Sequence, residues 1–128
     1  MIKYFDNTII YGNRDQAIQF ELYKQGRELI NGVWIIVNPN KVVTFKDGYI
    51  KMSMHNYYPS KAVDAVPYPI NFKDTDRIRY FAGFVMGIAA QLKADGKMTH
   101  DIRWGSDWDR DFLLNDETFL DLLHFEII

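Results

Sequence analysis

The chain has 128 residues, of which 15 are Lys or Arg and 17 are Asp or Glu, so its formal net charge is −2. This length fits a single domain spanning residues 1–128, and its 48% hydrophobic and 16% aromatic residues exclude a chain that is disordered by composition. The slightly acidic balance argues against a protein that binds nucleic acid, and the lack of cysteine excludes a disulfide framework, a thiol nucleophile and a Cys-ligated zinc site.

The N-terminal part of the chain predicts a strand followed by a helix. The β-rich run Thr8–Tyr11 predicts a short strand, which a Gly-Asn pair ends. A helix is expected over about Asp15–Gln25, because Ile18 and Leu22 are four residues apart and share one face. Gly26 is a suitable stop for this helix.

The next segment predicts turns and a β-hairpin. Asn31-Gly32 and Asn38-Pro39-Asn40 are turn signals on either side of the apolar run VWIIV. Lys41–Lys46 and Tyr49–His55 flank Asp47-Gly48, a dipeptide favoured in two-residue type I′ turns. Because the second of these runs also alternates in polarity, we expect the two runs to form a hairpin.

A strand and a long helix are predicted in the second half of the chain. The sequence AVDAV, residues 62–66, predicts a strand that prolines 67 and 69 end. A helix is expected from about Asp76 to Ala94, with Asp74 or Thr75 as its cap and Gly96 just past its end. The spacing of one buried face is followed by Phe81, Phe84, Val85, Ile88 and Leu92.

The C-terminal part predicts two further strands. Met98–Trp104 is expected as a strand before the polar loop GSDWDRD, and Asn115–Leu120 as one helical turn. Leu122–Ile128 is expected as the last strand. Several strands, a hairpin and two helices, without a regular βαβα rhythm, predict an α+β fold with a small antiparallel sheet and helices packed on it.

Three histidines limit the search for a metal site. Asp64 lies in an apolar strand, where a charge is costly unless it is paired or metal-bound. His55 precedes it by nine residues, and His124 lies on the last predicted strand. Two imidazoles and one carboxylate are a common ligand set for catalytic zinc, with water in the fourth position. His100 has no carboxylate at a useful spacing, and we expect it to be structural or exposed.

Two carboxylates flank His124 in the sequence. Asp121, three residues before it, is placed to accept a proton from metal-activated water. Glu126, two residues after it, falls on the same strand face and is placed to orient the ring. A single histidine on a strand is more often packed or exposed than a metal ligand, so both interpretations stay open on spacing alone.

Longer motifs favour the metal site. SMHNYYPSKAVDAVPYP (53–69) and DLLHFE (121–126) resemble the zinc peptidases of the D-alanyl-D-alanine carboxypeptidase and dipeptidase type, which include phage endolysins that are L-alanyl-D-glutamate peptidases. YGNRDQAIQFELYKQGR (11–27) and IRWGSDWDRD (102–111) are similar to two other segments of that family. The resemblance extends from about Ile10 to the C-terminus and implies a hedgehog/DD-peptidase-like fold.

The resemblance also implies a role for each site residue. Asp121 matches the catalytic base, Arg14 the arginine that stabilises the developing oxyanion, and Ser53 a serine that supports the substrate or the loop. The implied zinc ligands are His55, Asp64 and His124. The aromatic and acidic residues of the 104–109 segment fit either a cleft wall or, as we expect, a packed turn.

The sequence departs from the family pattern at three places. Ser106 replaces a glycine of the W-G-G-D-W stretch, and Leu123 stands where many relatives have proline. The segment 28–40 is longer than the usual connection. These changes leave each implied ligand in place, and we expect the longer segment to affect the shape of the cleft and the choice of substrate.

The resemblance implies a zinc-dependent endolysin that hydrolyses the L-alanyl-D-glutamate bond of the peptidoglycan stem peptide. Zn²⁺ is the implied cofactor and the stem peptide the implied partner. Two alternatives stay open: a D,D-carboxypeptidase or dipeptidase on the same scaffold, and a non-catalytic, zinc-stabilised binding module.

The N-terminus predicts a protein without an export signal. MIKYFDNTII lacks the apolar run of a secretory signal, and the longest apolar stretch, residues 81–90, is shorter than the roughly 20 residues that span a bilayer. We therefore expect a protein that does not insert into membranes, and separately we expect a monomer. The resemblance implies that it stays in the cytoplasm until it is released to the cell wall.

Overall fold

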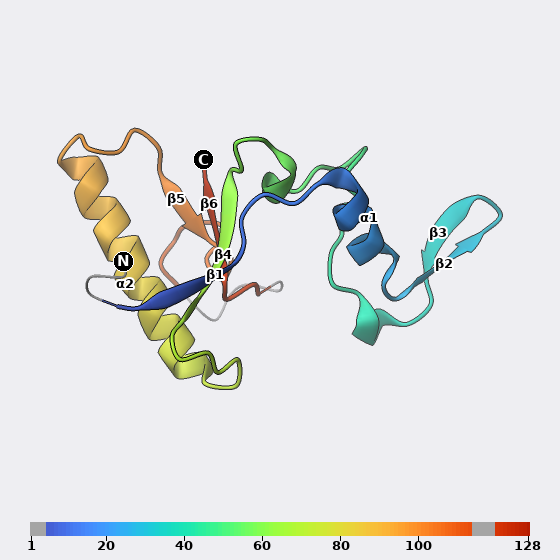
Figure 1. The fold of residues 1–128 in the computed structure, drawn as a ribbon, viewed down its shortest axis with the longest axis horizontal. Coiled ribbons are helices and arrows are strands. Elements are labelled where there is room, and N and C mark those ends of the chain that lie inside the picture. The colour runs from blue at the N-terminus through green and yellow to red at the C-terminus, as the bar shows by residue number, and fades with distance from the viewer. Residues whose placement is uncertain (1–4, 114–119) are drawn as a thin grey trace. The chain divides into compact units, whose positions relative to one another are not determined.

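The computed structural model describes residues 5–113 and 120–128, and the chain divides into two compact units (Figure 1). Unit 1 comprises Met1–Gly12 and Ala62–Ile128, and unit 2 comprises Asn13–Lys61. Unit 1 therefore combines the N-terminal strand with the second half of the chain, whereas unit 2 is one continuous segment.

Unit 1 is built on a four-stranded antiparallel sheet with the strand order β1-β4-β6-β5. The strands are β1 (Asn7–Tyr11), β4 (Ala62–Pro67), β5 (Ile102–Trp104) and β6 (His124–Ile127). The helix α2 (Thr75–Ala94) lies beside this sheet and contacts β4 and β5 (Figure 1). The predicted α+β fold with a small antiparallel sheet is confirmed.

The apolar core of unit 1 lies between α2 and one face of the sheet. It consists of the buried side chains of Ala65, Phe81, Ala82, Trp104 and Phe125. Successive side chains of a strand point to opposite faces, so Asp64 and His124, each next to a core residue in the sequence, belong to the other face. The sheet thus has an apolar face toward α2 and a second face that carries polar side chains.

Local signals account for the two ends of α2. The side chain of Asp74 accepts a hydrogen bond from the Arg77 amide at 3.1 Å and caps the N-terminus. Gly96 follows the helix with a φ of +73°, a conformation that favours glycine. Phe81 is 1% exposed whereas Leu92 is 36% exposed, so the buried stripe is shorter than its spacing predicts.

Unit 2 contains the helix α1 (Gln16–Lys24) and a two-stranded hairpin of β2 (Arg27–Ile30) and β3 (Val33–Ile36). Asp15 caps α1 at its N-terminus, as expected for a helix that starts there. The hairpin turns at Asn31-Gly32, where both residues have positive φ angles of +50° and +78°, as a type I′ turn requires. The turn predicted at this position is confirmed.

The predicted hairpin of Lys41–Lys46 and Tyr49–His55 is wrong. Asp47 Oδ1 accepts hydrogen bonds from the backbone amides of residues 49, 50 and 51, each at 2.9 Å. Those amides therefore bond to a local side chain and not to a facing strand. His55 lies in a short 3₁₀ helix, η2 (Met54–Asn56), instead of a strand.

A buried glutamine of α1 holds the segment that follows η1 (Pro39–Lys41). Gln19 is fully buried, and its Nε2 donates to the Lys46 carbonyl at 2.9 Å and to the Thr44 hydroxyl at 3.3 Å. Gly48 has a φ of +89°, and a Cβ there would lie 2.8 Å from Gln19 Cβ. The Asp-Gly pair therefore serves this close contact with α1 and not a hairpin turn.

The last predicted elements are shorter in the structure than the sequence predicts. β5 begins at Ile102 and not at Met98, and β6 occupies the centre of the predicted strand Leu122–Ile128. The helical turn predicted over Asn115–Leu120 falls almost entirely outside the described residues. Within the described ranges, no helix has the length and apolar character needed to cross a membrane.

Candidate metal centre

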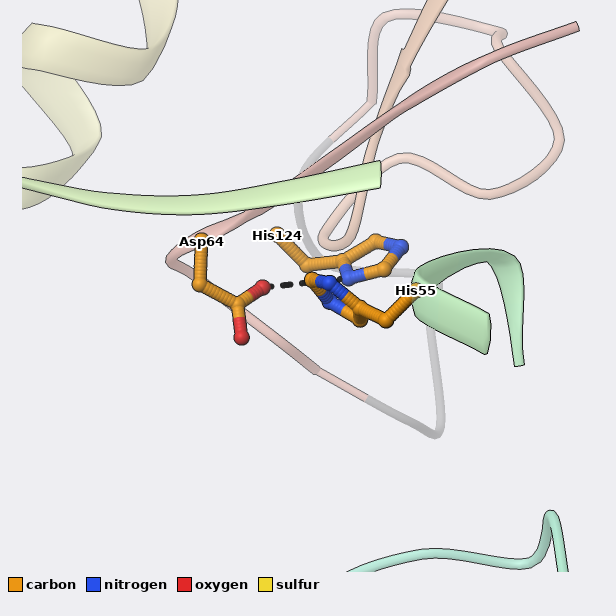
Figure 2. Close-up of side chains that lie close together, drawn as sticks. All are labelled: His55, Asp64 and His124. Atoms are coloured by element: carbon orange, nitrogen blue, oxygen red, sulfur yellow. Dashed lines mark hydrogen bonds and ion pairs between the residues drawn. The ribbon is translucent and has the colours of Figure 1, made fainter. Parts of the chain in front are cut away.

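Asp64 and His124 lie directly opposite each other in the pairing of β4 with β6. Asp64 Oδ1 is 3.2 Å from His124 Nδ1 (Figure 2), and the two side chains are 13% and 8% exposed. Opposite residues of an antiparallel pair lie on the same face and within contact distance. The apolar strand can carry Asp64 because the neighbouring strand brings an imidazole to it.

Glu126 contacts the other nitrogen of the His124 ring. The two residues are two positions apart on β6 and share a face, and Glu126 Oε1 is 2.8 Å from His124 Nε2. Arg103 Nη2 donates to Glu126 Oε2 at 2.7 Å. The predicted contact of Glu126 with His124 is confirmed. With Nε2 engaged by Glu126, the nitrogen on the Asp64 side, Nδ1, is the one left for a metal ion.

The carboxylates around His124 make this site attractive to a positive charge. Burial of the ring lowers its pKa, but hydrogen bonds to Asp64 and Glu126 and the charge of Asp121 outweigh burial and raise the pKa from 6.5 to about 9. Burial alone would raise the pKa of Glu126, but His124 and Arg103 outweigh it and lower that pKa. A proton on His124 and a metal ion at Nδ1 would neutralise the same excess of negative charge.

Asp121 lies beside this pair, in the loop before β6. Its Oδ2 is 4.0 Å from His124 Nδ1, and its side chain is 40% exposed. Gly105 fixes the loop, because its carbonyl accepts from the Asp121 amide at 2.7 Å and its amide donates to the His124 carbonyl at 2.8 Å. The carboxylate is therefore both near the ring and open to solvent, as a group that exchanges protons with a substrate must be.

In unit 2, Ser53 shapes the turn that carries His55. Ser53 Oγ accepts from the His55 amide at 3.3 Å, and Asn56 Oδ1 accepts from the Ser53 amide at 2.8 Å, which together form a capping box. The His55 side chain is buried, at 2% exposure for the residue. Of the two uses expected for Ser53, support of the loop is visible in these contacts, and contact with a substrate stays a prediction.

Residues just before α1 hold the His55 backbone in place. The His55 carbonyl accepts from the Arg14 amide at 2.8 Å and from Asn13 Nδ2 at 3.3 Å. Asn56 Nδ2 donates to the Arg14 carbonyl at 2.8 Å. The guanidinium of Arg14 donates to Gln19 Oε1 at 2.9 Å. Arg14 is thus fixed next to His55 along the backbone, and its role as an oxyanion donor stays a prediction.

His55, Asp64 and His124 together meet the distance requirement of a metal site. Each offers one ligand atom, and these atoms all lie within 4.8 Å of one another (Figure 2). Two imidazole nitrogens and one carboxylate oxygen suit zinc and several other divalent ions. The group is the predicted ligand set, and its residues fit such an ion.

A second acidic group and the third histidine do not contribute to this site. The group that also meets the distance requirement consists of Asp107, Asp109 and Asp111. The Asp107 carboxylate accepts from the amides of residues 111 and 112, each at 3.2 Å, so it holds the loop itself. These bonds support the packed turn that we expected here. His100 is exposed, and its Nδ1 lies 3.1 Å from Thr99 Oγ1.

One neighbour of the site could not be recognised from the sequence. Arg103 reaches Glu126 because the two residues are opposite each other in the pairing of β5 with β6. The sequence shows that Arg103 is a cation on a predicted strand, but it does not show the β5–β6 register that places Arg103 opposite Glu126. Trp108, which the sequence allowed as a cleft residue, has its ring centroid 5.6 Å from that of His124.

In comparisons with known proteins, no family model, no curated protein and no solved structure matches this chain.

Proposed function

We propose that the protein is a zinc-dependent peptidase that hydrolyses the L-alanyl-D-glutamate bond of peptidoglycan stem peptides, in the manner of an endolysin. The observation that carries this proposal is the His55, Asp64 and His124 group with the Asp121 carboxylate beside it. The chemistry of the ligand set supports the metal. The motif resemblance supports the substrate and the bond.

Each site residue has a role in the proposed reaction. The residues that would hold zinc are His55, Asp64 and His124. When bound, zinc supplies Lewis acidity that polarises the scissile carbonyl and acidifies a water molecule. Asp121 takes the proton of the attacking water and later delivers it to the leaving amine. Arg14 donates a charge-assisted hydrogen bond to the oxyanion that develops on the carbonyl oxygen.

The number of ligands and the exposure of Asp121 favour a catalytic site over a structural one. Structural zinc sites are closed by four protein ligands, whereas catalytic sites keep a position for water. Within residues 5–113 and 120–128, the group supplies three ligands. Asp121 is 40% exposed while the ligands His55 and His124 are buried, and a purely structural site needs no accessible base.

Asp121→Ala tests the proposal most simply, because Asp121 acts on protons and is not a ligand. We expect this variant to bind zinc as the wild type does and to clear suspended cell-wall sacculi at least about 100-fold more slowly, the scale of a lost general base. The matched control is Glu21→Gln, which removes an exposed carboxylate of α1 that pairs with Lys24.

The measurements are bound zinc per chain and the rate of loss of turbidity. Full activity of Asp121→Ala would exclude Asp121 as the base. Full activity of the wild type after its zinc has been removed by a chelator would exclude a zinc mechanism altogether.

A further inference from the structure

Arg103 makes the ion pair that allows Glu126 to be buried on the polar face of the sheet. The two residues are opposite each other in the β5–β6 pairing, and Arg103 Nη2 lies 2.7 Å from Glu126 Oε2. The Glu126 side chain is 6% exposed, so removing Arg103 would take one of its partners from a buried carboxylate. The other oxygen of Glu126 contacts His124 Nε2 at 2.8 Å. Arg103 therefore acts on His124 through Glu126.

The same guanidinium reaches His124 by a second route. Arg103 Cζ lies 5.6 Å from the centroid of the Trp108 ring, within the range of a cation–π contact. The Trp108 ring lies 5.6 Å from the His124 ring, at an interplanar angle of 41°. Arg103 thus contacts both the carboxylate at one ring nitrogen of His124 and the aromatic ring beside it.

We propose that Arg103 is a positioning residue of the metal centre. Its guanidinium holds Glu126 and Trp108 together, and these two residues fix the plane of the His124 ring so that Nδ1 stays directed toward Asp64. The proposal rests on metal binding by the His55, Asp64 and His124 group.

The planar shape of arginine is essential to this role. The guanidinium donates from Nη2 to Glu126 while its Cζ lies 5.6 Å from the centre of the Trp108 ring, and a lysine ammonium, as a compact charge on a flexible chain, cannot keep both contacts. Loss of groups that orient metal ligands typically weakens metal binding by about 10- to 100-fold. Arg103→Lys keeps the positive charge but removes the planar guanidinium. It therefore tests whether Arg103 orients His124 or only compensates the charge of Glu126.

The test measures zinc affinity and the state of the His124 ring in the full chain. Zinc affinity is obtained by competition with a chromophoric chelator. Long-range ¹H–¹⁵N spectra of the zinc-loaded protein show which nitrogen of His124 carries the proton. We expect zinc at Nδ1 and the proton at Nε2 in the wild type. For Arg103→Lys we expect at least about 10-fold weaker zinc binding and altered His124 ring shifts. Arg110→Lys, which changes an arginine that pairs with Asp101 on the surface, is the control and should leave both unchanged.

The outcomes distinguish this inference from the proposed function. A wild type that binds no zinc contradicts both. A wild type that binds zinc, with Arg103→Lys equal to it in affinity and ring shifts, overturns the role of Arg103 and leaves the peptidase proposal standing. Zinc bound at Nε2 of His124 in the wild type also overturns the inference, and this last result needs no variant to fold.

Discussion

At the scale of single residues, His124 links the protonation of the site to its stability. In the metal-free protein, burial lowers the pKa of His124, but the carboxylates of Asp64 and Glu126 outweigh burial, so the folded pKa of about 9 exceeds the unfolded value of 6.5. The stabilisation that this proton provides is therefore complete below about pH 6.5 and is lost as the pH rises through about 9.

The expected result is that His124→Gln costs the metal-free protein more stability at about pH 6 than at about pH 9.5. Urea unfolding of both chains in the presence of a chelator measures this difference. Because the two chains are compared at each pH, other groups that titrate in both cancel. An equal cost at the two pH values would contradict the carboxylate contacts of His124.

For Ser106, a substitution is expected to raise the stability of the protein. It is 3% exposed, and among the described residues its Oγ has no hydrogen-bond partner. A buried polar group without a partner costs about 1–3 kcal/mol, so Ser106→Ala should stabilise the protein by about 1 kcal/mol. The measurement is the midpoint of urea unfolding at neutral pH. A destabilised variant would show that the hydroxyl makes a useful bond.

The site residues differ in how far the sequence could predict them. Asp64 stood out because a charge interrupts an apolar run, and Asp121 and Glu126 because their spacing from His124 is short. Such signals act along one strand or one loop. Arg103 gave no such signal, because its partner Glu126 is 23 positions away and only the strand register brings them together.

At the scale of elements, Gly105 joins the end of β5 to the loop that carries Asp121. A Cβ at this position would overlap the Asp121 carbonyl oxygen and would lie 2.9 Å from Asp121 Cβ and 3.0 Å from His124 Cβ. Because the nearest atom is the backbone oxygen of Asp121, it can shift only if the loop itself is displaced, which costs folding free energy. Gly105→Ala should therefore destabilise the protein by about 1–3 kcal/mol and displace Asp121, which lowers turnover in the sacculus assay.

Gly87→Ala is the matched control for that change. Gly87 lies inside α2, and a Cβ there meets nothing within 4 Å. The variant should gain about 0.5–1 kcal/mol from the higher helix propensity of alanine and keep its activity. Thermal unfolding and the sacculus assay measure both variants. If Gly105→Ala matched Gly87→Ala in stability and activity, the close contact of Gly105 with Asp121 would be contradicted.

The helices and turns also show which elements can be predicted from local sequence signals alone. Both helices were predicted because the spacing of their apolar residues, and for α2 the cap at Asp74, act within a few residues. The hairpin predicted around Asp47-Gly48 does not form, because the Asp47 carboxylate and the buried Gln19 side chain bond to the backbone of that segment in place of a facing strand. Asn31-Gly32 does form a hairpin turn, so the same kind of dipeptide leads to different structures depending on its contacts.

At the scale of the whole molecule, binding of the proposed zinc ion is linked to the stability of the folded chain. We expect zinc at about 100 times its dissociation constant to stabilise the folded chain by about 2.7 kcal/mol. His55→Ala should lose most of this gain. Thermal unfolding with and without zinc measures it, and an undiminished gain in the variant would remove His55 from the ligand set.

The most direct measurement of the proposed function is mass spectrometry of stem-peptide fragments released from purified sacculi by the zinc-loaded protein. The proposal predicts fragments that begin with D-glutamate, produced by the wild type and not by Asp121→Ala. Release of terminal D-alanine would instead indicate a D,D-carboxypeptidase. Intact stem peptides after incubation with zinc-loaded wild type would contradict the peptidase proposal and favour a binding module.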